Sequence, residues 1–203
     1  LTYSITEGTD ITASLSGSDV SFSAPADYNG SESFTVAVTD GEYTDSQTIS
    51  VTVIPVNDAP TANAASGATN EDQSIVVALT GDDIDGDNLT FSLGDSAANG
   101  SVSLDGSLAT YTPNTNYNGD DSFIFNVSDG EYSASANVSV SVAAVNDAPV
   151  LATVSDVSFD EDGSGSASLS GSDVDGDDLT YSITEGTDIT ASLSGSDVSF
   201  SAP

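Results

Sequence analysis

The chain has 203 residues, and its 33 Asp and Glu residues face no Lys, Arg or His, which gives a formal net charge of −33 at pH 7. No side-chain salt bridge is available to the carboxylates, so each must be solvated, hydrogen-bonded to a backbone N–H group or bound to a cation. This charge excludes nucleic acid and anionic membrane surfaces as partners, because nothing in the sequence can neutralise phosphate.

The hydrophobic residues indicate a folded chain rather than a disordered one. They make up 37% of the sequence, and Val, Ile, Phe and Tyr alternate with Thr and Ser in short runs. Such alternation is typical of half-buried strands, and no stretch has the period of a helix. Cysteine is absent, so no disulfide holds the fold. No signal peptide, transmembrane run or lipidation motif is visible, and no membrane insertion is expected in this segment.

The sequence is built from repeats. Residues 1–25 are identical to residues 179–203, which lie 178 positions further along the chain. A more diverged copy lies between them, since Val-Asn-Asp-Ala-Pro at 56–60 recurs 89 positions later at 145–149. The repeat unit is therefore about 89 residues long, and the exact repetition spans two units.

We expect one whole repeat at 59–147, flanked by the C-terminal part of another at 1–58 and by the N-terminal part of the next at 148–203. The simplest interpretation is a segment of a longer array. A second interpretation is that the incomplete ends complete each other between molecules in a head-to-tail polymer. Light scattering that shows only monomer would exclude the polymer.

In chain order, the whole repeat is predicted to form strands at 61–66, 74–80, 89–93, 101–104, 107–112, 122–128 and 132–143. Asp105-Gly106 is a strong signal for a two-residue hairpin turn. The residues expected to face the core are Phe91, Leu93, Val102, Leu104, Leu108, Tyr111, Phe123, Phe125, Val127, Val138, Val140 and Val142. Short strands separated by turns, in a unit of this size, predict an all-β fold of the Greek-key β-sandwich type with one thin core.

Two acidic motifs recur with the repeat. The first, Asn57-Asp58-Ala59-Pro60, lies where one repeat meets the next, and we call this place the first joint; the second joint is its copy at 146–149. Proline holds the preceding residue in extended geometry, so each joint should be short and stiff. The second motif is a loop with carboxylates at alternate positions around one glycine, at Asp83, Asp85 and Asp87 and again 90 positions later.

The loop carries the ligands that calcium prefers, because calcium takes six to eight oxygens from carboxylates, carbonyls and amides. It is not an EF-hand, since the twelfth position counted from Asp83 is Gly94 rather than Glu. A solvated loop remains the alternative. Glu71-Asp72 early in the repeat, and Asp129 at a predicted hairpin, are weaker signals that ordinary turns would also explain.

The order of these elements resembles the cadherin calcium scaffold. The closest similarity is to the cadherin-like tandem repeats of giant bacterial surface adhesins and filamentous surface proteins, whose units end in Val-Asn-Asp-Ala-Pro and carry the Asp-rich loop before Leu-Thr-Tyr. The resemblance covers the whole chain, and its most specific parts are 56–60, 145–149, 83–90 and 173–181. It implies tandem cadherin-like or Ig-like sandwiches joined by short calcium-binding linkers.

The resemblance also implies a set of calcium ligands at each joint. For the first joint these are Asn57, Asp58, Asp83, Asp85 and Asp129. For the second joint they are Glu71, Asn146, Asp147, Asp173 and Asp175.

The sequence departs from the cadherin pattern in one motif. Cadherins carry acidic residues where this repeat has Asn114 and Asn116, while Asp27 of the first repeat matches Asn116. We therefore expect one or two calcium ions at each joint rather than three.

These features predict a calcium-rigidified structural extender in an extracellular bacterial adhesin or surface filament, which projects a tip or builds a biofilm matrix. Its expected partners are calcium ions and the neighbouring repeats. Extracellular modules bind calcium with dissociation constants of about 10⁻⁴–10⁻³ M. Calcium reaches such concentrations outside cells but not in the cytosol.

The alternative is a calcium-dependent module that binds polysaccharide or makes homophilic contacts between filaments. The absence of Trp argues against sugar binding, and binding to glycans in an array or pull-down would favour it. Ice binding is a weaker alternative, because no regular Thr-x-Thr ladder is seen. No enzyme activity is expected, since His, Cys and Lys are missing and the acidic pairs recur with the repeat as structural elements do.

Overall fold

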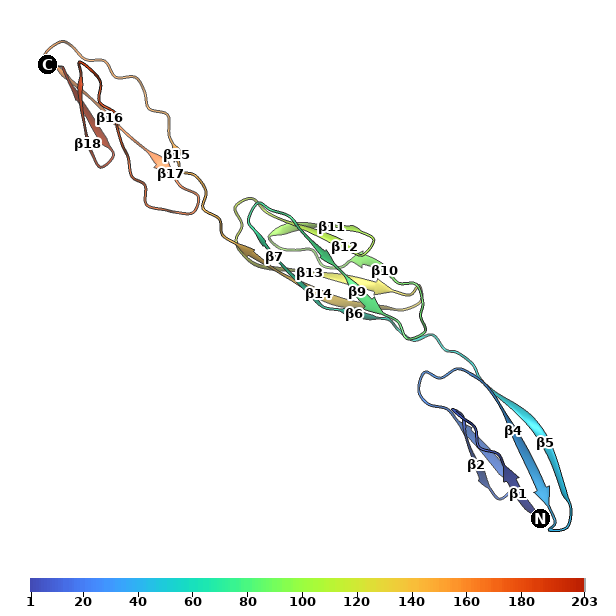
Figure 1. Cartoon of the computed structure of the whole chain (residues 1–203). Coiled ribbons are helices and arrows are strands. Elements are labelled where there is room, and N and C mark those ends of the chain that lie inside the picture. The colour runs from blue at the N-terminus through green and yellow to red at the C-terminus, as the bar shows by residue number, and fades with distance from the viewer. Residues whose placement is uncertain (203) are drawn as a thin grey trace.

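The computed structural model describes residues 1–202, and residue 203, the last of the predicted third repeat, lies outside the described residues. Strands β1–β5, β6–β14 and β15–β19 form three separate β units, which we call the first, middle and third units (Figure 1). The units follow one another in a row, with the two termini at opposite ends. Among residues 1–202, no helix is long and apolar enough to cross a membrane.

The middle unit is a two-layered β-sandwich, which confirms the predicted fold class. One layer is the sheet β10-β13-β14-β7, and the other contains the sheet β11-β12-β8 and the pair β6-β9. All pairs are antiparallel except β14 with β7. The strands are β6 Thr61–Asn63, β7 Ala65–Asn70, β8 Ile75–Ala78, β9 Thr80–Asp82, β10 Thr90–Leu93, β11 Gly100–Asp105, β12 Leu108–Pro113, β13 Gly119–Ser128 and β14 Ser133–Ala143.

The first two predicted strands are each divided in two. Strand β6 pairs with β9, whereas β7 crosses to the other layer and pairs in parallel with β14. The second strand breaks at Leu79, whose side chain is 2% exposed and whose N–H donates to the Ser107 carbonyl at 2.8 Å. The alternation of apolar residues continues across the break at Leu79, so it could not reveal that break.

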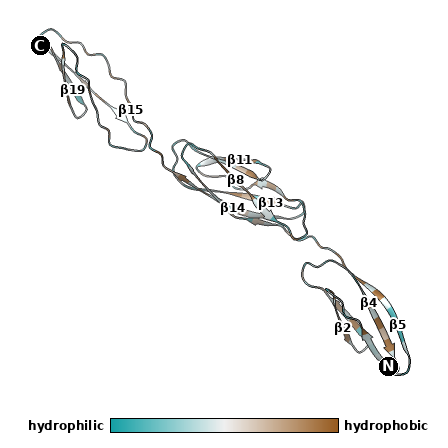
Figure 2. Cartoon of the chain, in the orientation of Figure 1, coloured by the Kyte–Doolittle hydropathy of each residue, from teal (hydrophilic) through white to brown (hydrophobic). Residues whose placement is uncertain are grey.

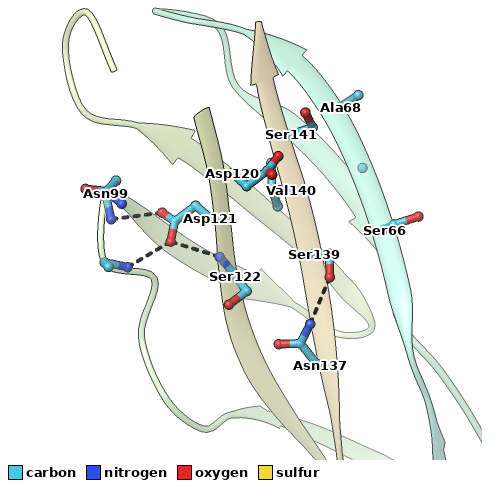
Figure 3. Close-up of a pocket in the computed structure, with 12 residues that line it drawn as sticks. Ser66, Ala68, Asn99, Asp120, Asp121, Ser122, Asn137, Ser139, Val140 and Ser141 are labelled. Carbon is cyan, nitrogen blue, oxygen red and sulfur yellow. Dashed lines mark hydrogen bonds between the residues drawn. The ribbon is translucent and has the colours of Figure 1, made fainter. Parts of the chain in front are cut away.

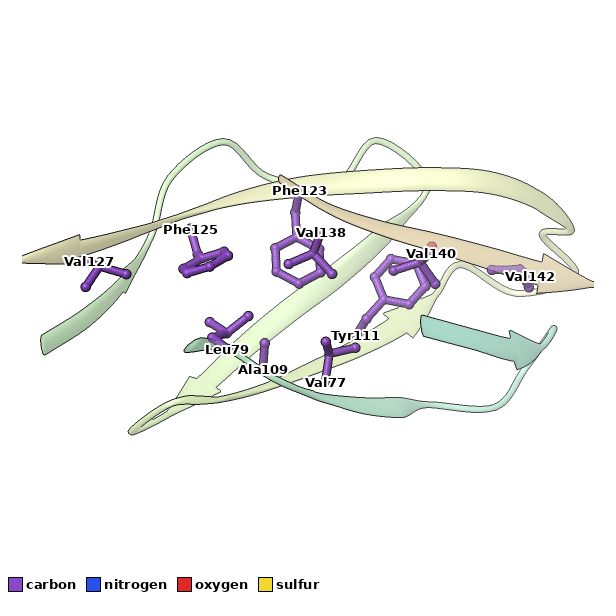
Figure 4. Packing of buried hydrophobic residues seen from close by; sticks show 10 residues of the cluster. All are labelled: Val77, Leu79, Ala109, Tyr111, Phe123, Phe125, Val127, Val138, Val140 and Val142. Atoms are coloured by element: carbon purple, nitrogen blue, oxygen red, sulfur yellow. The ribbon is translucent and has the colours of Figure 1, made fainter. Parts of the chain in front are cut away.

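The core of the middle unit lies between the two layers (Figure 4). Alternate residues of β13 and β14 face residues of β8, β12 and the break after β8. The buried cluster is Val77, Leu79, Ala109, Tyr111, Phe123, Phe125, Val127, Val138, Val140 and Val142. It confirms the inward orientation predicted for most of these positions.

Two residues predicted to face the core are largely exposed. Leu108 is 47% exposed, because Ala109 and Tyr111 take the inward positions of β12 and neighbouring residues of a strand point to opposite faces. Leu93 is 39% exposed at the last position of β10. Tyr111 is larger than Leu108, and the burial of Tyr111 determines which face of β12 points inward.

The outer units repeat parts of this pattern. The first unit contains the sheet β1-β4-β5 and the hairpin β2-β3, and the third contains the sheet β16-β19-β18 and the pair β15-β17. Hydrophobic and hydrophilic residues intermingle along their strands, for example in β4 and β5 (Figure 2). Their bounds are β1 Thr2–Ile5, β2 Thr12–Ser16, β3 Asp19–Ser23, β4 Gly30–Thr39, β5 Thr44–Val53, β15 Val150–Leu151, β16 Ser164–Ser168, β17 Gly171–Ser172, β18 Thr190–Ser194 and β19 Asp197–Ser201.

Candidate metal centres at the joints

The first joint is tied to the middle unit by two hydrogen bonds from the linker. The Asn57 Nδ2 group donates to Asp129 Oδ2 at 2.9 Å, and the Asp58 N–H donates to Asp85 Oδ2 at 2.8 Å. Asp129 lies in the β13–β14 hairpin, where its other oxygen accepts the N–H groups of Glu131 and Tyr132. The linker thus contacts two loops that are far apart in the sequence.

The Asp-rich loop of the middle unit is folded around Asp83. Asp83 Oδ1 accepts the N–H groups of Asp85 at 3.0 Å and Asp87 at 3.3 Å. Gly86 has a φ of 80°, a left-handed conformation that glycine adopts without steric cost. Asp83 Oδ2 is buried and has no hydrogen-bond partner among the described residues. One oxygen of Asp83 therefore shapes the loop, and the other stays available.

The second joint has the same geometry. The Asp147 N–H donates to Asp175 Oδ2 at 2.7 Å. Asp173 Oδ1 accepts the N–H groups of Asp175 at 3.0 Å and Asp177 at 3.3 Å. Asn146 Nδ2 donates to the Asp147 carbonyl at 2.8 Å. The arrangement belongs to the repeat, since it recurs with different neighbouring residues.

Glu71 reaches the second linker from the body of the middle unit. Its side chain is only 4% exposed. Oε1 accepts the N–H group of Val145, and the backbone N–H of Glu71 donates to the Ala143 carbonyl at 2.9 Å. Oε2 of Glu71, like Oδ2 of Asp147, is buried and has no hydrogen-bond partner within residues 1–202. The structure thus gathers the predicted residues of each joint around its linker.

The linker aspartates lie in an unfavourable environment. Burial raises the pKa of Asp58, and the like charges of Asp27, Asp85 and Asp83 raise it further. Burial likewise raises the pKa of Asp147, whose carboxyl also faces Asp175, Asp72, Glu71 and Asp173. Both shifts favour the protonated form, so these groups stabilise the folded joint most at low pH and least at neutral pH. A nearby positive charge would have the opposite effect on these pKa values.

The donor chemistry of the joints fits calcium. A buried carboxylate oxygen without a partner is costly, and the three such oxygens found within residues 1–202 belong to Glu71, Asp83 and Asp147. All the predicted ligands offer carboxylate or amide oxygens, which suit a hard cation. Over the same residues, no group of three or more Asp and Glu side chains is already placed to hold a metal ion. Several of these side chains instead accept hydrogen bonds from the backbone.

Two acidic residues outside the predicted set also lie at the joints. Asp27 lines a cavity of about 270 Å³ at the first joint together with Asp58 and Asp85. Asp72 Oδ1 accepts the N–H group of Asn116 at 3.1 Å at the other end of the middle unit. In the sequence, Asp72 could be associated with a joint because it follows Glu71. Asp27 could be associated with one because it occupies the position that corresponds to Asn116.

Asp121 is a structural acid that the sequence reasoning missed. It is 9% exposed and accepts a hydrogen bond from the Tyr111 hydroxyl at 2.9 Å. It also accepts hydrogen bonds from the N–H groups of Ala98 at 3.1 Å, Asn99 at 2.8 Å and Ser122 at 2.8 Å (Figure 3). Burial raises its pKa, but these hydrogen bonds outweigh burial and hold the pKa below its usual value.

The first unit uses an acid in the same way. Glu32 accepts the N–H groups of Thr9, Asp10 and Ile11. The sequence feature that could have pointed to Asp121 is its position two residues before Phe123, which places both side chains on the inward face of β13. These acids fix the loop between the two sheets rather than a joint.

A polar groove lies beside Asp121 on the outer face of the sheet (Figure 3). Its volume is about 940 Å³. It is lined mainly by small polar side chains of β7 and β14, including Ser66, Asn137, Ser139 and Ser141.

Comparison with known proteins supports the fold of this repeat. Residues 57–141 match the family model described as a bacterial Ig domain. No curated protein sequence matches the chain significantly.

Solved structures that match the chain include cadherin ectodomains. Domains 1–3 of mouse protocadherin-24 match with 16% identity and a TM-score of 0.59, covering 100% of this chain and 77% of that one. Domains 1–4 of protocadherin gamma B7 match with 13% identity and a TM-score of 0.55, covering 100% and 58%.

An endo-fucoidan hydrolase of glycoside hydrolase family 107, MfFcnA4, matches with 17% identity and a TM-score of 0.37, covering 99% of this chain. The chain spans about a third, 34%, of that enzyme.

Bacterial Ig and cadherin-like folds are typically non-enzymatic. Residues 57–141 thus form an Ig-like, cadherin-like β-sandwich repeat.

Proposed function

We propose that the chain is a calcium-rigidified structural extender of an extracellular bacterial adhesin or surface filament. One observation carries the proposal. The buried carboxylate oxygens without hydrogen-bond partners in residues 1–202 belong to Glu71, Asp83 and Asp147, and all three are predicted calcium ligands at the joints. Elsewhere in the middle unit a buried acid such as Asp121 is fully hydrogen-bonded.

The residues of each joint hold the linker against the next unit. Asn57 and Asp58 connect the first linker to the hairpin at Asp129 and to the loop at Asp85. Calcium, when bound, supplies the positive charge that offsets the repulsion between these carboxylates. The residues then fix the angle between the repeats at 1–58, 59–147 and 148–203, and without the cation the same carboxylates repel one another and loosen the linker.

The chemistry of the sites also indicates where the protein works. Extracellular calcium modules have dissociation constants of about 10⁻⁴–10⁻³ M, which extracellular calcium can saturate. Bacterial Ig and cadherin-like domains are typically extracellular or surface-exposed. The partners we infer are calcium and the neighbouring repeats of the same chain.

Small-angle X-ray scattering tests the extender function. In millimolar calcium we expect the profile of a straight rod, and in chelator a shorter mean length and a broader distribution of shapes. A chain carrying both Asp85→Asn and Asp175→Asn is the matched control, and it should scatter in calcium as the wild type does in chelator. Identical wild-type profiles in the two buffers would contradict the proposal.

The polar groove beside Asp121 favours one alternative function, binding of polysaccharide. Its Ser and Asn side chains can hydrogen-bond to sugar hydroxyls. Such binding would persist in chelator, because the groove is formed by the sheet rather than by a joint. Binding that requires calcium would instead favour a site at a joint.

A further inference from the structure

One 25-residue sequence occurs twice in this chain and has two different structures. Residues 1–25 are identical to residues 179–203. In the first unit, Thr2–Ile5 is strand β1 and pairs with β4. The same four residues at 180–183, in the third unit, form no strand. Because the residues are the same, the difference must come from what packs against them.

In the first unit, residues 26–58 supply the packing partner, since they contain β4 and β5. Phe34 of β4 is 0% exposed, and its ring centroid lies 5.0 Å from that of Phe22. The same ring lies directly against Gly8, where it leaves no room for a Cβ atom. Ile11 is only 1% exposed in this unit.

The third unit has a hollow at the corresponding place. Its volume is about 300 Å³, and most of its lining side chains are apolar. Gly186 and Phe200, which line it, are the counterparts of the two residues that lie against Phe34. Ile189, the counterpart of Ile11, also lines the hollow and is 45% exposed. A side chain placed as Phe34 is would therefore fill the hollow.

The backbone around the hollow offers matching hydrogen-bond donors. In the first unit, Glu32 of β4 accepts the N–H groups of residues 9–11. Their counterparts at 187–189 donate to no side chain within residues 1–202. The segment that carries Phe34 thus also carries the acceptor for these groups.

The middle unit shows which strand edges would meet. There β14 pairs in parallel with β7. Strand β5 corresponds to β14 and pairs only with β4 among the described residues. Residues 155–160, which correspond to β7, form no strand. The two ends of the chain therefore carry complementary unpaired edges, and such edges are templates for pairing with another chain.

We infer that the open face of the third unit is a docking surface for residues 26–58 of a second molecule of this chain, so that molecules join head to tail. Residues 179–203 of one molecule then replace residues 1–25 of the other. This exchange conserves the contacts of the identical sequence and adds the pairing of β5 with residues 155–160. The first and third units lie at opposite ends of the chain, so a molecule cannot cover its own face (Figure 1). The inference goes beyond the proposed function and requires no calcium.

Two variants each disable one end. Ile189→Asp places a charge where the joined state buries the side chain, although position 189 is exposed in the free chain. Ser4→Cys with Ala37→Cys joins residues directly opposite each other in β1 and β4, and its disulfide holds the first unit closed. Val174→Asp is the control for the added charge, because Val174 matches Ile84, which is 64% exposed in the middle unit.

Light scattering after refolding from urea at graded concentrations measures the mass, in high salt to screen the net charge of −33. The wild type and Val174→Asp should grow in mass with concentration, in calcium and in chelator alike. Ile189→Asp and the oxidised cysteine variant, oxidised beforehand at low concentration, should each remain monomeric. Their equimolar mixture should reach twice the monomer mass and no more, since each molecule keeps one working end. Reduction should restore growth to the cysteine variant.

A wild type that stays monomeric at every concentration would overturn the inference and leave calcium binding at the joints untouched. Growth of Ile189→Asp equal to that of the wild type would also overturn it, because association would then not use the open face.

Discussion

Replacing Asp121 by Ala should lower the free energy of unfolding of the middle unit by about 3 kcal/mol or more. The Asp121 carboxylate accepts a hydrogen bond from the hydroxyl of Tyr111, which is 0% exposed, and from the N–H groups of Ala98 and Asn99. The substitution would leave these donors in the interior without a partner. A sandwich of this size has a stability of only about 5–10 kcal/mol, so the loss is a large part of the total.

Urea denaturation followed by Tyr fluorescence measures this effect. Asp120→Ala is the matched control, because Asp120 is the adjacent acid but is exposed at the groove. Equal stabilities of the two variants would show that Asp121 is not a structural acid.

The same residue predicts a dependence on pH. Hydrogen bonds hold the pKa of Asp121 below its usual value despite burial. Its stabilising contribution is therefore present above the unfolded-state pKa of about 3.9 and is lost as the pH falls through the folded-state pKa. Asp121→Ala should show a smaller loss of stability than the wild type over that acidic range.

Calcium at about one hundred times the dissociation constant should stabilise the folded chain by about 2.7 kcal/mol for each site. The cation binds the folded joints and offsets the repulsion that burial and neighbouring charges impose on Asp58 and Asp147. Thermal melting in calcium and in chelator measures the effect. Equal melting temperatures in the two buffers would exclude calcium as a stabilising ligand.

Two controls separate specific binding from screening of the net charge of −33. The ionic strength is held constant with sodium chloride, because salt alone weakens repulsion between exposed charges. Magnesium at the same concentration should stabilise the chain less, since it retains its water ligands and requires strict octahedral geometry.

The sequence predicted the all-β sandwich because its strands alternate clearly and its turns are marked by Gly, Asp and Asn. It could not show that β8 and β9 are separate strands, since alternation continues through the break at Leu79. It also could not show that β7 crosses to the other layer, because that crossing depends on pairing with β14, which is far along the chain. It also placed Leu108 and Tyr111 on one face of β12, although residues three positions apart in a strand point to opposite faces.

The joints were predictable where their residues lie in short recurring motifs. Asp83 and Asp85 are two positions apart, and their loop is recognisable without tertiary structure. The hydrogen bond from Asn57 to Asp129 joins residues 72 positions apart and required the folded hairpin. Asp121 could not be recognised from the sequence, because the donors that it pairs with, on Ala98, Asn99 and Tyr111, come together only in the folded unit.

Distance measurement between spin labels across a joint tests the central claim most directly. The chain has no Cys, so introduced cysteines can be labelled selectively. Exposed strand residues supply the pairs: Ser50→Cys with Ser103→Cys spans the first joint, and Ser103→Cys with Ser166→Cys spans the second. Ser103→Cys with Ser139→Cys lies within the middle unit and is the control.

We expect narrow distance distributions across both joints in calcium and broad ones in chelator, with the control pair unchanged. Distributions across the joints that are equally narrow, or equally broad, in both buffers would contradict calcium-dependent stiffness.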